Sequence, residues 1–292
     1  MTSSRPNGGI TFEFEDERTV QTLSAQLSRF AEVFKDSQIV QTLSGQLSWS
    51  HFIEFIYPKD ALQRQFYSEM ARVERWSVRT LRQKVQGMLY ERTAISRKPD
   101  ELARQEMEAL AEEDRMTPDL VFKDPYLLDF LGLEDTYSER DLEAAILREL
   151  ERFLLELGTD FSFVARQKRM TIGDQDFCLD LLFYHRSLRR LVAMELKLGR
   201  FTAAYKGQME LYLRWLEKYE CRPGEEPPIG LILCSEKNYE QIELLQLDRG
   251  ETRVAEYLLE LPPKQMLEAK LHEAISRAKG QMAARVHQDQ TD

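Results

Sequence analysis

The sequence predicts an α/β protein in two parts, an all-helical N-terminal domain followed by a core of order αβββαβ with a mixed sheet. Apolar residues recur at helical spacing from residue 36 to residue 115, whereas helical segments alternate with strand-like runs after residue 138. The length of 292 residues and the hydrophobic content of 42% suffice for one large or two ordinary domains with cores of their own. These values exclude a disordered chain.

The N-terminal half carries helix signals along most of its length. The string QTLSAQLSRF at residues 21–30 returns as QTLSGQLSWS at residues 41–50, which predicts two related amphipathic helices. Ser77 is placed to cap a helix over the segment VRTLRQKVQGMLY. We expect residues 1–17 to be disordered and residues 18–115 to form the helical domain.

Charge is distributed unevenly along the chain. The formal net charge is -10, which by itself gives no support for a nucleic-acid partner. Residues 100–139 are strongly acidic, whereas residues 64–98 and 166–206 are basic. We expect residues 116–137 to be an acidic connector, and either basic block is a candidate for binding an anionic partner.

The chain shows no signal for export or for insertion into a membrane. No basic segment precedes an apolar run at the N-terminus, and no uncharged stretch approaches the roughly 18 residues of a membrane span. The three cysteines lack the spacing of a metal site and lie in or beside apolar segments, as reduced cysteines do. We therefore expect a cytoplasmic protein without a membrane partner.

The C-terminal half alternates between helix and strand signals. A long helix is expected from Ser138, followed by three strands at residues 161–172, 175–185 and 189–198. A helix at 202–219, a strand at 229–235, another helix, a strand at 252–260 and a last helix after the prolines at 262 and 263 are expected next. We expect this folded region to cover residues 138–280 and a flexible tail to cover residues 281–292.

Five polar side chains point into this predicted core. Glu195 and Lys197 are two apart on a strand, so they share a face, and Asp180 lies in an otherwise apolar strand. Helical wheels place Glu143 and Gln208 among the apolar residues of two helices. Three inward carboxylates suit Mg²⁺ or Mn²⁺, and a neighbouring ammonium can orient a water or offset charge on an oxyanion. This equipment favours metal-dependent hydrolysis of phosphodiester bonds.

The same charges also have a purely structural interpretation. Asp180, Glu195 and Lys197 would then form an ion-pair network that only compensates buried charge. The strand context argues against it, because the chain's other Glu-x-Lys string, Glu268 to Lys270, lies on a helix where the two side chains point apart.

Long strings around these residues resemble the PD-(D/E)XK nuclease superfamily, and specifically its YhcG-type family of bacterial proteins. The similar strings are LSWSHF, RWSVRTLRQKV, FKDPYLLDFLGL, DLEAAI, FLLELG, FVARQKR, DLLFYHRSLRRLVAMELKLGRF and GQMELYL, which together span about residues 41–262. One departure is Leu179, where the superfamily's name motif has a proline before the aspartate.

The resemblance implies a restriction-endonuclease-like fold but does not settle the substrate. Our hypothesis is a metal-dependent endonuclease that acts on nucleic acid, DNA rather than RNA. It implies that Glu143, Asp180, Glu195 and Lys197 belong to the active site, with Gln208 as an auxiliary residue. A different class of function stays open, in which the nuclease fold is catalytically silent and serves as a scaffold that binds DNA or protein.

Basic side chains outside the five-residue constellation are candidates for binding nucleic acid. Arg75, Arg79 and Arg82 lie within two turns of one another, as in the second helix of a helix-turn-helix. Arg166 and Lys168 are two apart on a strand, so we expect them to share a face that leads to the metal site. A solvated surface is the alternative for both groups. The repeated amphipathic helices also suggest self-association through the N-terminal domain.

Overall fold

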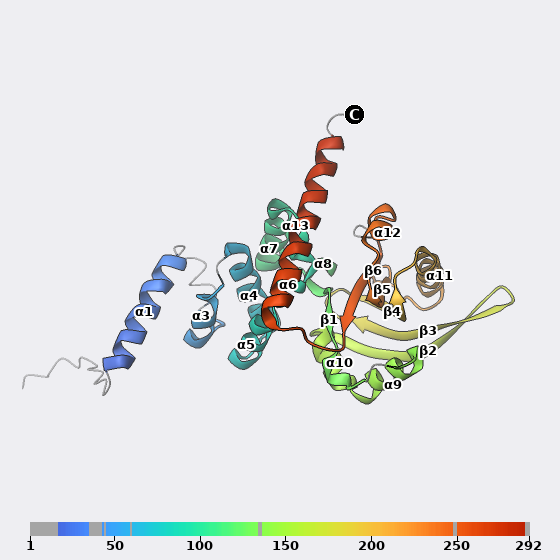
Figure 1. Cartoon of the computed structure of the whole chain (residues 1–292), viewed down its shortest axis with the longest axis horizontal. Helices are drawn as coiled ribbons and strands as arrows, with labels where there is room; N and C mark the ends of the chain where they lie inside the picture. Colours follow the sequence, from blue (N-terminus) through green and yellow to red (C-terminus); the bar gives the residue numbers. More distant parts are fainter. Residues whose placement is uncertain are drawn as a thin grey trace, which may run out of the picture. The chain divides into compact units, whose positions relative to one another are not determined.

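The computed structural model divides the chain into two compact units, Met1–Gln83 and Lys84–Asp292, which we describe in turn (Figure 1). It describes residues 17–34, 43, 45–58, 60–133, 136–247 and 250–289. The expected disordered start lies outside these residues except for residue 17, which begins a helix.

The N-terminal unit is helical in its described residues, as predicted. Its helices are α1 (Glu17–Val33), α3 (Trp49–Phe55), α4 (Ala61–Val73) and the first part of α5 (Val78–Gln86). Phe30 of α1 packs edge-on against Phe52 of α3, with their ring centroids 5.6 Å apart. Such contacts build an aromatic core from helices that are individually too short to be stable in water.

Residues 21–30, the first copy of the repeated string, lie within α1. In the second copy Leu43 is helical, residues 45–47 form a turn and α3 begins at Trp49, whereas residues 41, 42 and 44 lie outside the described residues. The expectation of a second, related helix therefore stays a prediction. The turn contains Gly45 where the first copy has Ala25, and glycine costs a helix about 1 kcal/mol relative to alanine.

The cap predicted at Ser77 is confirmed, but the helix after it is shorter than expected. Ser77 Oγ accepts a hydrogen bond from the backbone N–H of Thr80 at 3.1 Å. Helix α5 ends at Gln86, Met88 adopts a left-handed backbone with φ of 51°, and α6 (Leu89–Arg92) follows as a separate turn.

The compact N-terminal unit ends at residue 83, whereas the sequence led us to expect a domain that ends at residue 115. The segments that follow α6 belong to the C-terminal unit: η1 (Ala94–Arg97), α7 (Asp100–Glu113) and α8 (Pro118–Val121). Met88 packs with Leu267 and Leu271 of the last helix, α13 (Lys264–Asp289). Helix periodicity cannot show this boundary, because it records which face is apolar and not which neighbour covers it.

The C-terminal unit is built on a six-stranded mixed sheet in the order β1-β6-β5-β4-β3-β2 (Figure 1). Its strands are β1 (Tyr126–Leu127), β2 (Phe161–Ile172), β3 (Gln175–His185), β4 (Arg190–Arg200), β5 (Ile229–Glu236) and β6 (Thr252–Leu258). Strands β2, β3 and β4 are antiparallel neighbours, and β4, β5, β6 and β1 run parallel. The predicted mixed α/β fold is confirmed, with β1 as an additional strand.

Helices cover both faces of this sheet. One face carries α9 (Glu139–Arg148) and α10 (Leu150–Leu157), where Phe153 packs on Phe183 of β3. The other face carries α11 (Ala203–Tyr219), which lies so close that a Cβ on Gly230 of β5 would be 2.5 Å from Met209. The short helix α12 (Tyr239–Leu244) follows β5.

The helix expected from Ser138 begins as predicted but is interrupted. Ser138 Oγ accepts from the N–H of Asp141 at 3.2 Å, which is an N-terminal cap. Glu149 has a non-helical backbone that separates α9 from α10. At the other end of the chain α13 continues as one helix to Asp289, where a flexible tail from residue 281 was expected. Among the described residues, no helix is long and apolar enough to cross a lipid bilayer.

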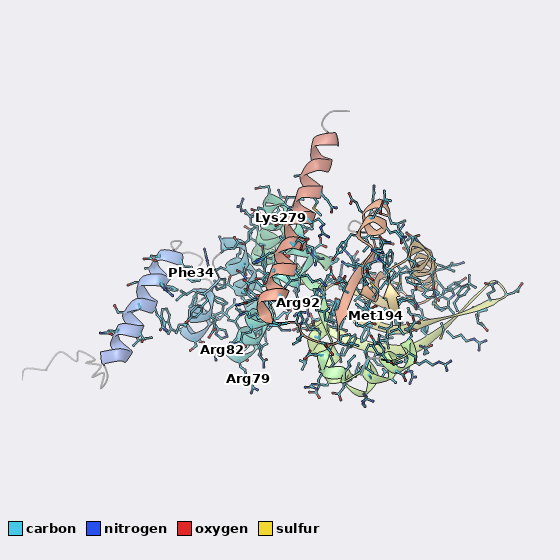
Figure 2. All side chains as sticks on the ribbon, in the orientation of Figure 1. Phe34, Arg79, Arg82, Arg92, Met194 and Lys279 are labelled. Carbon is cyan, nitrogen blue, oxygen red and sulfur yellow. The ribbon has the colours of Figure 1, made fainter. Side chains whose placement is uncertain are left out.

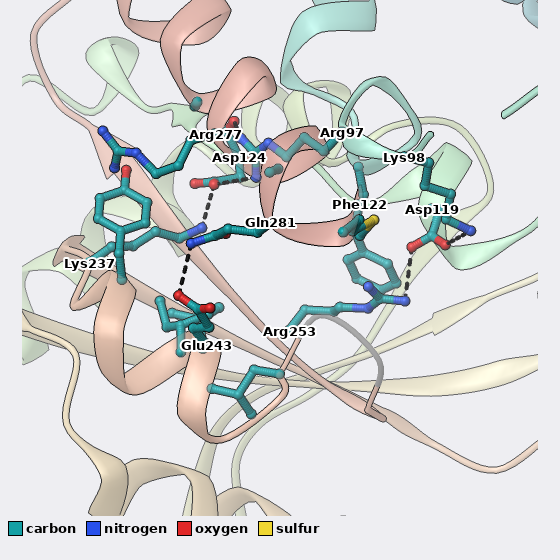
Figure 3. Close-up of a pocket in the computed structure, with 18 of the residues that line it drawn as sticks. Arg97, Lys98, Asp119, Phe122, Asp124, Lys237, Glu243, Arg253, Arg277 and Gln281 are labelled. Carbon is teal, nitrogen blue, oxygen red and sulfur yellow. Dashed lines mark hydrogen bonds and ion pairs between the residues drawn. The ribbon is translucent and has the colours of Figure 1, made fainter. Parts of the chain in front are cut away.

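Residues 116–133 and 136–137, which belong to the expected acidic connector, are folded into the C-terminal unit. They supply α8, β1, η2 (Asp129–Leu131) and the buried carboxylate of Asp124, which binds Arg97 and Lys237 (Figure 3). The same carboxylate accepts from the backbone N–H of Glu256. Local charge counting misreads this segment because its acidic side chains bind cations that are distant in the sequence.

Candidate active site

Strands β3 and β4 separate where Asp180 and Glu195 face each other. The antiparallel ladder pairs His185 with Arg190 and continues as far as Leu181 with Met194. One step further, carboxylates replace the ladder: Asp180 Oδ2 accepts from the N–H of Leu196 at 2.9 Å, and Glu195 Oε1 accepts from the N–H of Asp180 at 3.3 Å. The two carboxylates therefore lie together, on the sheet face that α11 covers.

Lys197 lies beside this carboxylate pair, and its predicted shared face with Glu195 is confirmed. Its Nζ is 2.9 Å from Glu195 Oε2 and 5.5 Å from the ring centroid of Tyr205 on α11. Burial alone would lower the pKa of this ammonium, but the charges of Glu195, Glu139 and Asp180 outweigh burial and raise it. Lys197 is therefore a permanent cation at neutral pH.

The carboxylates themselves are only partly compensated. Burial, followed by the negative charge of Asp180, raises the pKa of Glu195 to about 7 despite the contact with Lys197. Burial also raises the pKa of Asp180, although the N–H of Leu196 and the charge of Lys197 oppose this effect. A pair of adjacent carboxylates, one buried and one half-buried, with raised pKa values is a site where an additional cation would be stabilising.

Glu143 is buried on α9, as predicted, and reaches the pair through another side chain. Its Oε1 accepts from Arg166 Nε at 2.7 Å, and its Oε2 accepts from Gln167 Nε2 at 2.6 Å. Gln167 Nε2 also lies 3.2 Å from Asp180 Oδ1. Within the described part of the chain, no three Asp, Glu, His or Cys side chains converge in an arrangement that could hold a metal ion. The site is thus a pair of carboxylates, with the third linked to it by Gln167.

Gln208 is half-buried on α11 and donates to the hydroxyl of Tyr212, one turn further along, at 2.6 Å. Burial raises the pKa of this hydroxyl, and the charges of Glu195 and Asp180 raise it further. The predicted Gln208 therefore holds the hydroxyl of Tyr212, and Tyr212 is the α11 side chain that senses the charges of the two carboxylates.

Arg166 and Lys168 do not share a strand face, so that expectation is wrong. Arg166 is paired with Leu181 in the sheet and binds Glu143 of α9. Lys168 binds Glu220 at 2.6 Å, at the end of α11, so it lies on the opposite face of the sheet. The reason is Gln167 between them, whose left-handed backbone with φ of 46° resets the alternation of the strand.

Two residues of the site were missed from the sequence. Gln167 appears only inside the similar string FVARQKR, and no pattern marks it as an inward residue. Glu139, in the first turn of α9, accepts from the N–H of Leu198 at 3.1 Å and adds negative charge beside Lys197. A carboxylate in the first turn of a helix is ordinarily explained by the helix dipole, so it gave no signal.

The arginines predicted in the N-terminal unit have different surroundings. Arg82 Nη2 binds Glu54 Oε1 at 2.6 Å, whereas Arg79 is exposed (Figure 2). Arg75 is also exposed. Arg75 precedes α5 with a left-handed backbone, φ of 53°.

Family comparison covers most of the chain. Residues 119–272 match the family model described as the YhcG PDDEXK nuclease domain, and residues 12–92 match the DUF1016 N-terminal domain. The protein named "Putative nuclease YhcG" of Escherichia coli (strain K12) is 39% identical over 219 residues, which cover 75% of this chain. The match spans 58% of that protein's length.

Two solved structures also resemble the chain. A repair endonuclease from Pyrococcus abyssi is 20% identical, with a TM-score of 0.31 over 44% of this chain and 50% of that chain. A complex of EndoMS with double-stranded DNA is 19% identical, with a TM-score of 0.30 over 45% of this chain and 48% of that chain.

Proposed function

Because the chain belongs to the YhcG PDDEXK nuclease family, we propose that it hydrolyses phosphodiester bonds of DNA with the help of a bound divalent metal ion. One observation carries this proposal: the carboxylates of half-buried Asp180 and buried Glu195 lie together, next to the permanent ammonium of Lys197. The family match covers the segment that contains all three residues.

The donor set fits Mg²⁺ or Mn²⁺. Mg²⁺ is commonly bound by one or two carboxylates together with waters and substrate phosphates, so Asp180 and Glu195 would hold it, and Glu143 is linked to Asp180 through Gln167. Glu139, Glu143, Asp180 and Glu195 outnumber the cations Lys197 and Arg166 by two charges, which a divalent ion would balance. When bound, such an ion lowers the pKa of its water and polarises a phosphoryl oxygen.

The side chains of the protein then have separate tasks. Lys197 keeps its proton, so it acts as a hydrogen-bond donor and a positive charge that orients a water and offsets charge on the phosphate, and not as a general base. Deprotonation of Glu195 is required before it can bind a cation, and its pKa of about 7 makes this step pH-dependent.

Binding of the DNA backbone is proposed for basic side chains near and outside the site. Arg166 is more than half exposed while it contacts Glu143, so its guanidinium can also reach a phosphate. Lys168 lies on the other face and would contact a separate part of the substrate. In the N-terminal unit, Arg75 and Arg79 are the exposed candidates.

The test is cleavage of plasmid, branched and single-stranded DNA, with RNA in parallel, in the presence of Mg²⁺ or Mn²⁺. Asp180→Asn should abolish cleavage, because it removes one of two charged ligands without changing shape. Asp176→Asn on the same strand is the matched control, since Asp176 is exposed and binds only Arg169 and Thr171 in the described structure. Cleavage by Asp180→Asn at the wild-type rate would overturn the proposal.

A further inference from the structure

Gln167 occupies an unusual position, in the middle of β2 and between two carboxylates from different elements. We infer that it is a positioning residue, which holds Glu143 of α9 beside Asp180 of β3 and so sets the affinity of the site for its divalent ion. The inference rests on the proposed function and adds a role for a residue that touches neither substrate nor metal directly.

The hydrogen bonds of the Gln167 side chain leave its amide with one orientation. The two hydrogens on Nε2 are directed to Glu143 Oε2 at 2.6 Å and to Asp180 Oδ1 at 3.2 Å. Oε1 accepts from Cys178 Sγ at 3.1 Å. A flipped amide would place its oxygen against two carboxylates, so the NH₂ group must face them. A neutral side chain thus bridges two negative groups that would otherwise repel each other.

The backbone of Gln167 supports the same conclusion. A non-glycine residue with φ of 46° inside a β-strand is strained, and such strain persists where the surroundings hold it in place. In this strand the left-handed residue turns Arg166 toward Glu143 and leaves Lys168 on the α11 face. The strained conformation therefore brings two adjacent residues, Arg166 and Gln167, to the same carboxylate.

A structural role and a positioning role predict different results for glycine at this position. Glycine adopts φ of 46° without strain, so Gln167→Gly should leave the melting temperature unchanged or raise it. The bridge is lost, so Glu143 and Asp180 are free to move apart. Affinity for Mn²⁺ should then fall at least tenfold, and the Mn²⁺ concentration for half-maximal cleavage should rise by the same factor, while cleavage at saturating Mn²⁺ recovers.

The experiment titrates Mn²⁺ into the full chain and follows free Mn²⁺ by electron paramagnetic resonance, with cleavage and thermal unfolding measured on the same samples. Gln167→Asn is the second variant, since asparagine tolerates a left-handed backbone but is too short to reach both carboxylates. It should bind Mn²⁺ as weakly as Gln167→Gly. Gln175→Gly is the matched control, because Gln175 is exposed at the far end of the same hairpin.

The possible results separate this inference from the proposed function. Wild-type affinity for Mn²⁺ in both variants would overturn the positioning role and leave the nuclease proposal intact. Weaker Mn²⁺ binding together with a lowered melting temperature would assign Gln167 a structural role. This result would also overturn the inference. A wild-type chain that neither binds Mn²⁺ nor cleaves DNA would overturn both proposals.

Discussion

The C-terminal unit buries carboxylates in two clusters that treat charge in opposite ways. Around Asp124, Oδ2 binds Arg97 Nη1 at 2.6 Å and the ammonium of Lys237, while Oδ1 accepts from the N–H of Glu256 at 2.9 Å (Figure 3). Burial alone would raise the pKa of Asp124, but the charges of Lys237 and Arg97 outweigh burial and hold it far below its usual value. This carboxylate is more than compensated.

Around Asp180 the balance is reversed. Buried Glu195 and half-buried Asp180 share one ammonium, that of Lys197, and the pKa values of both carboxyls are raised. Burial acts to raise the carboxyl pKa in both clusters, so burial by itself does not distinguish them. The difference teaches that a carboxylate whose cations are supplied by the fold stabilises the protein, whereas one whose cations are missing marks a place for a cation from outside.

The largest expected effect comes from the ammonium of the candidate active site. Lys197→Met should reduce DNA cleavage by about a thousandfold, since it removes a charge aimed at the reacting phosphate. Stability should change little, because Glu195 can take up a proton when its partner is lost. Plasmid cleavage and thermal unfolding measure the two effects. Lys237→Met is the matched variant in the other cluster, and an equal loss of stability in both variants would break the comparison.

Neutralising the compensated carboxylate should mainly affect folding. Asp124→Asn leaves buried Lys237 and partly buried Arg97 without their anion, and breaking a buried pair typically costs about 3–5 kcal/mol of unfolding free energy. Urea unfolding followed by circular dichroism measures this cost. The exposed Asp176→Asn should cost much less, because exposed ion pairs contribute little. Similar midpoints for the two variants would contradict the proposed difference.

The two clusters should also respond oppositely to pH. The pKa of Glu195 is about 7 in the folded protein, against roughly 4.3 in the unfolded chain. Its contribution to the free energy of unfolding is therefore fully present below the unfolded pKa and is lost as the pH rises through the folded pKa. Asp124 has a lowered pKa, so its contribution is present above the unfolded value and lost in acid.

Chemical unfolding without divalent metal, from pH 5 to pH 8, tests the first of these effects. Relative to Glu195→Gln, the free energy of unfolding of the wild type should fall by roughly 2–3 kcal/mol between pH 5 and pH 8. Parallel stability curves for the two proteins would show that Glu195 does not carry the raised pKa.

The smallest expected effect concerns the surface of the N-terminal unit, where one arginine is paired with a carboxylate and another is exposed. Arg82 binds Glu54, whereas Arg79 is exposed, so Arg79→Ala should weaken DNA binding about two- to fivefold and reduce the salt dependence by about one ion. Arg82→Ala should weaken it less. Fluorescence anisotropy at several salt concentrations checks both, and equal binding by Arg79→Ala and the wild type would remove Arg79 from the DNA-binding surface.

Much of this architecture could be predicted from local patterns. Alternating apolar residues predicted the three antiparallel strands, Ser77 and Ser138 predicted helix starts, and the two-residue step from Glu195 to Lys197 predicted their contact. These features depend on residues within a few positions of one another, where backbone geometry dictates which side chains meet.

Other features depend on contacts between distant segments, and no local pattern contains them. Asp124 counted as one charge of an acidic connector, yet its partners lie 27 and 113 positions away. The unit boundary at residue 83 and the break at Glu149 follow from packing, which overrides periodicity.

The amino-acid sequence by itself determined the strands, the helix caps and the presence of acidic groups on an apolar sheet, because side-chain spacing along a regular backbone dictates direction. Only the tertiary structure decided how those charges are balanced. One left-handed residue, Gln167, reverses the alternation of β2 and links a helix carboxylate to a strand carboxylate. Charge balance is a sum over neighbours in space, so it exists only once the chain has folded.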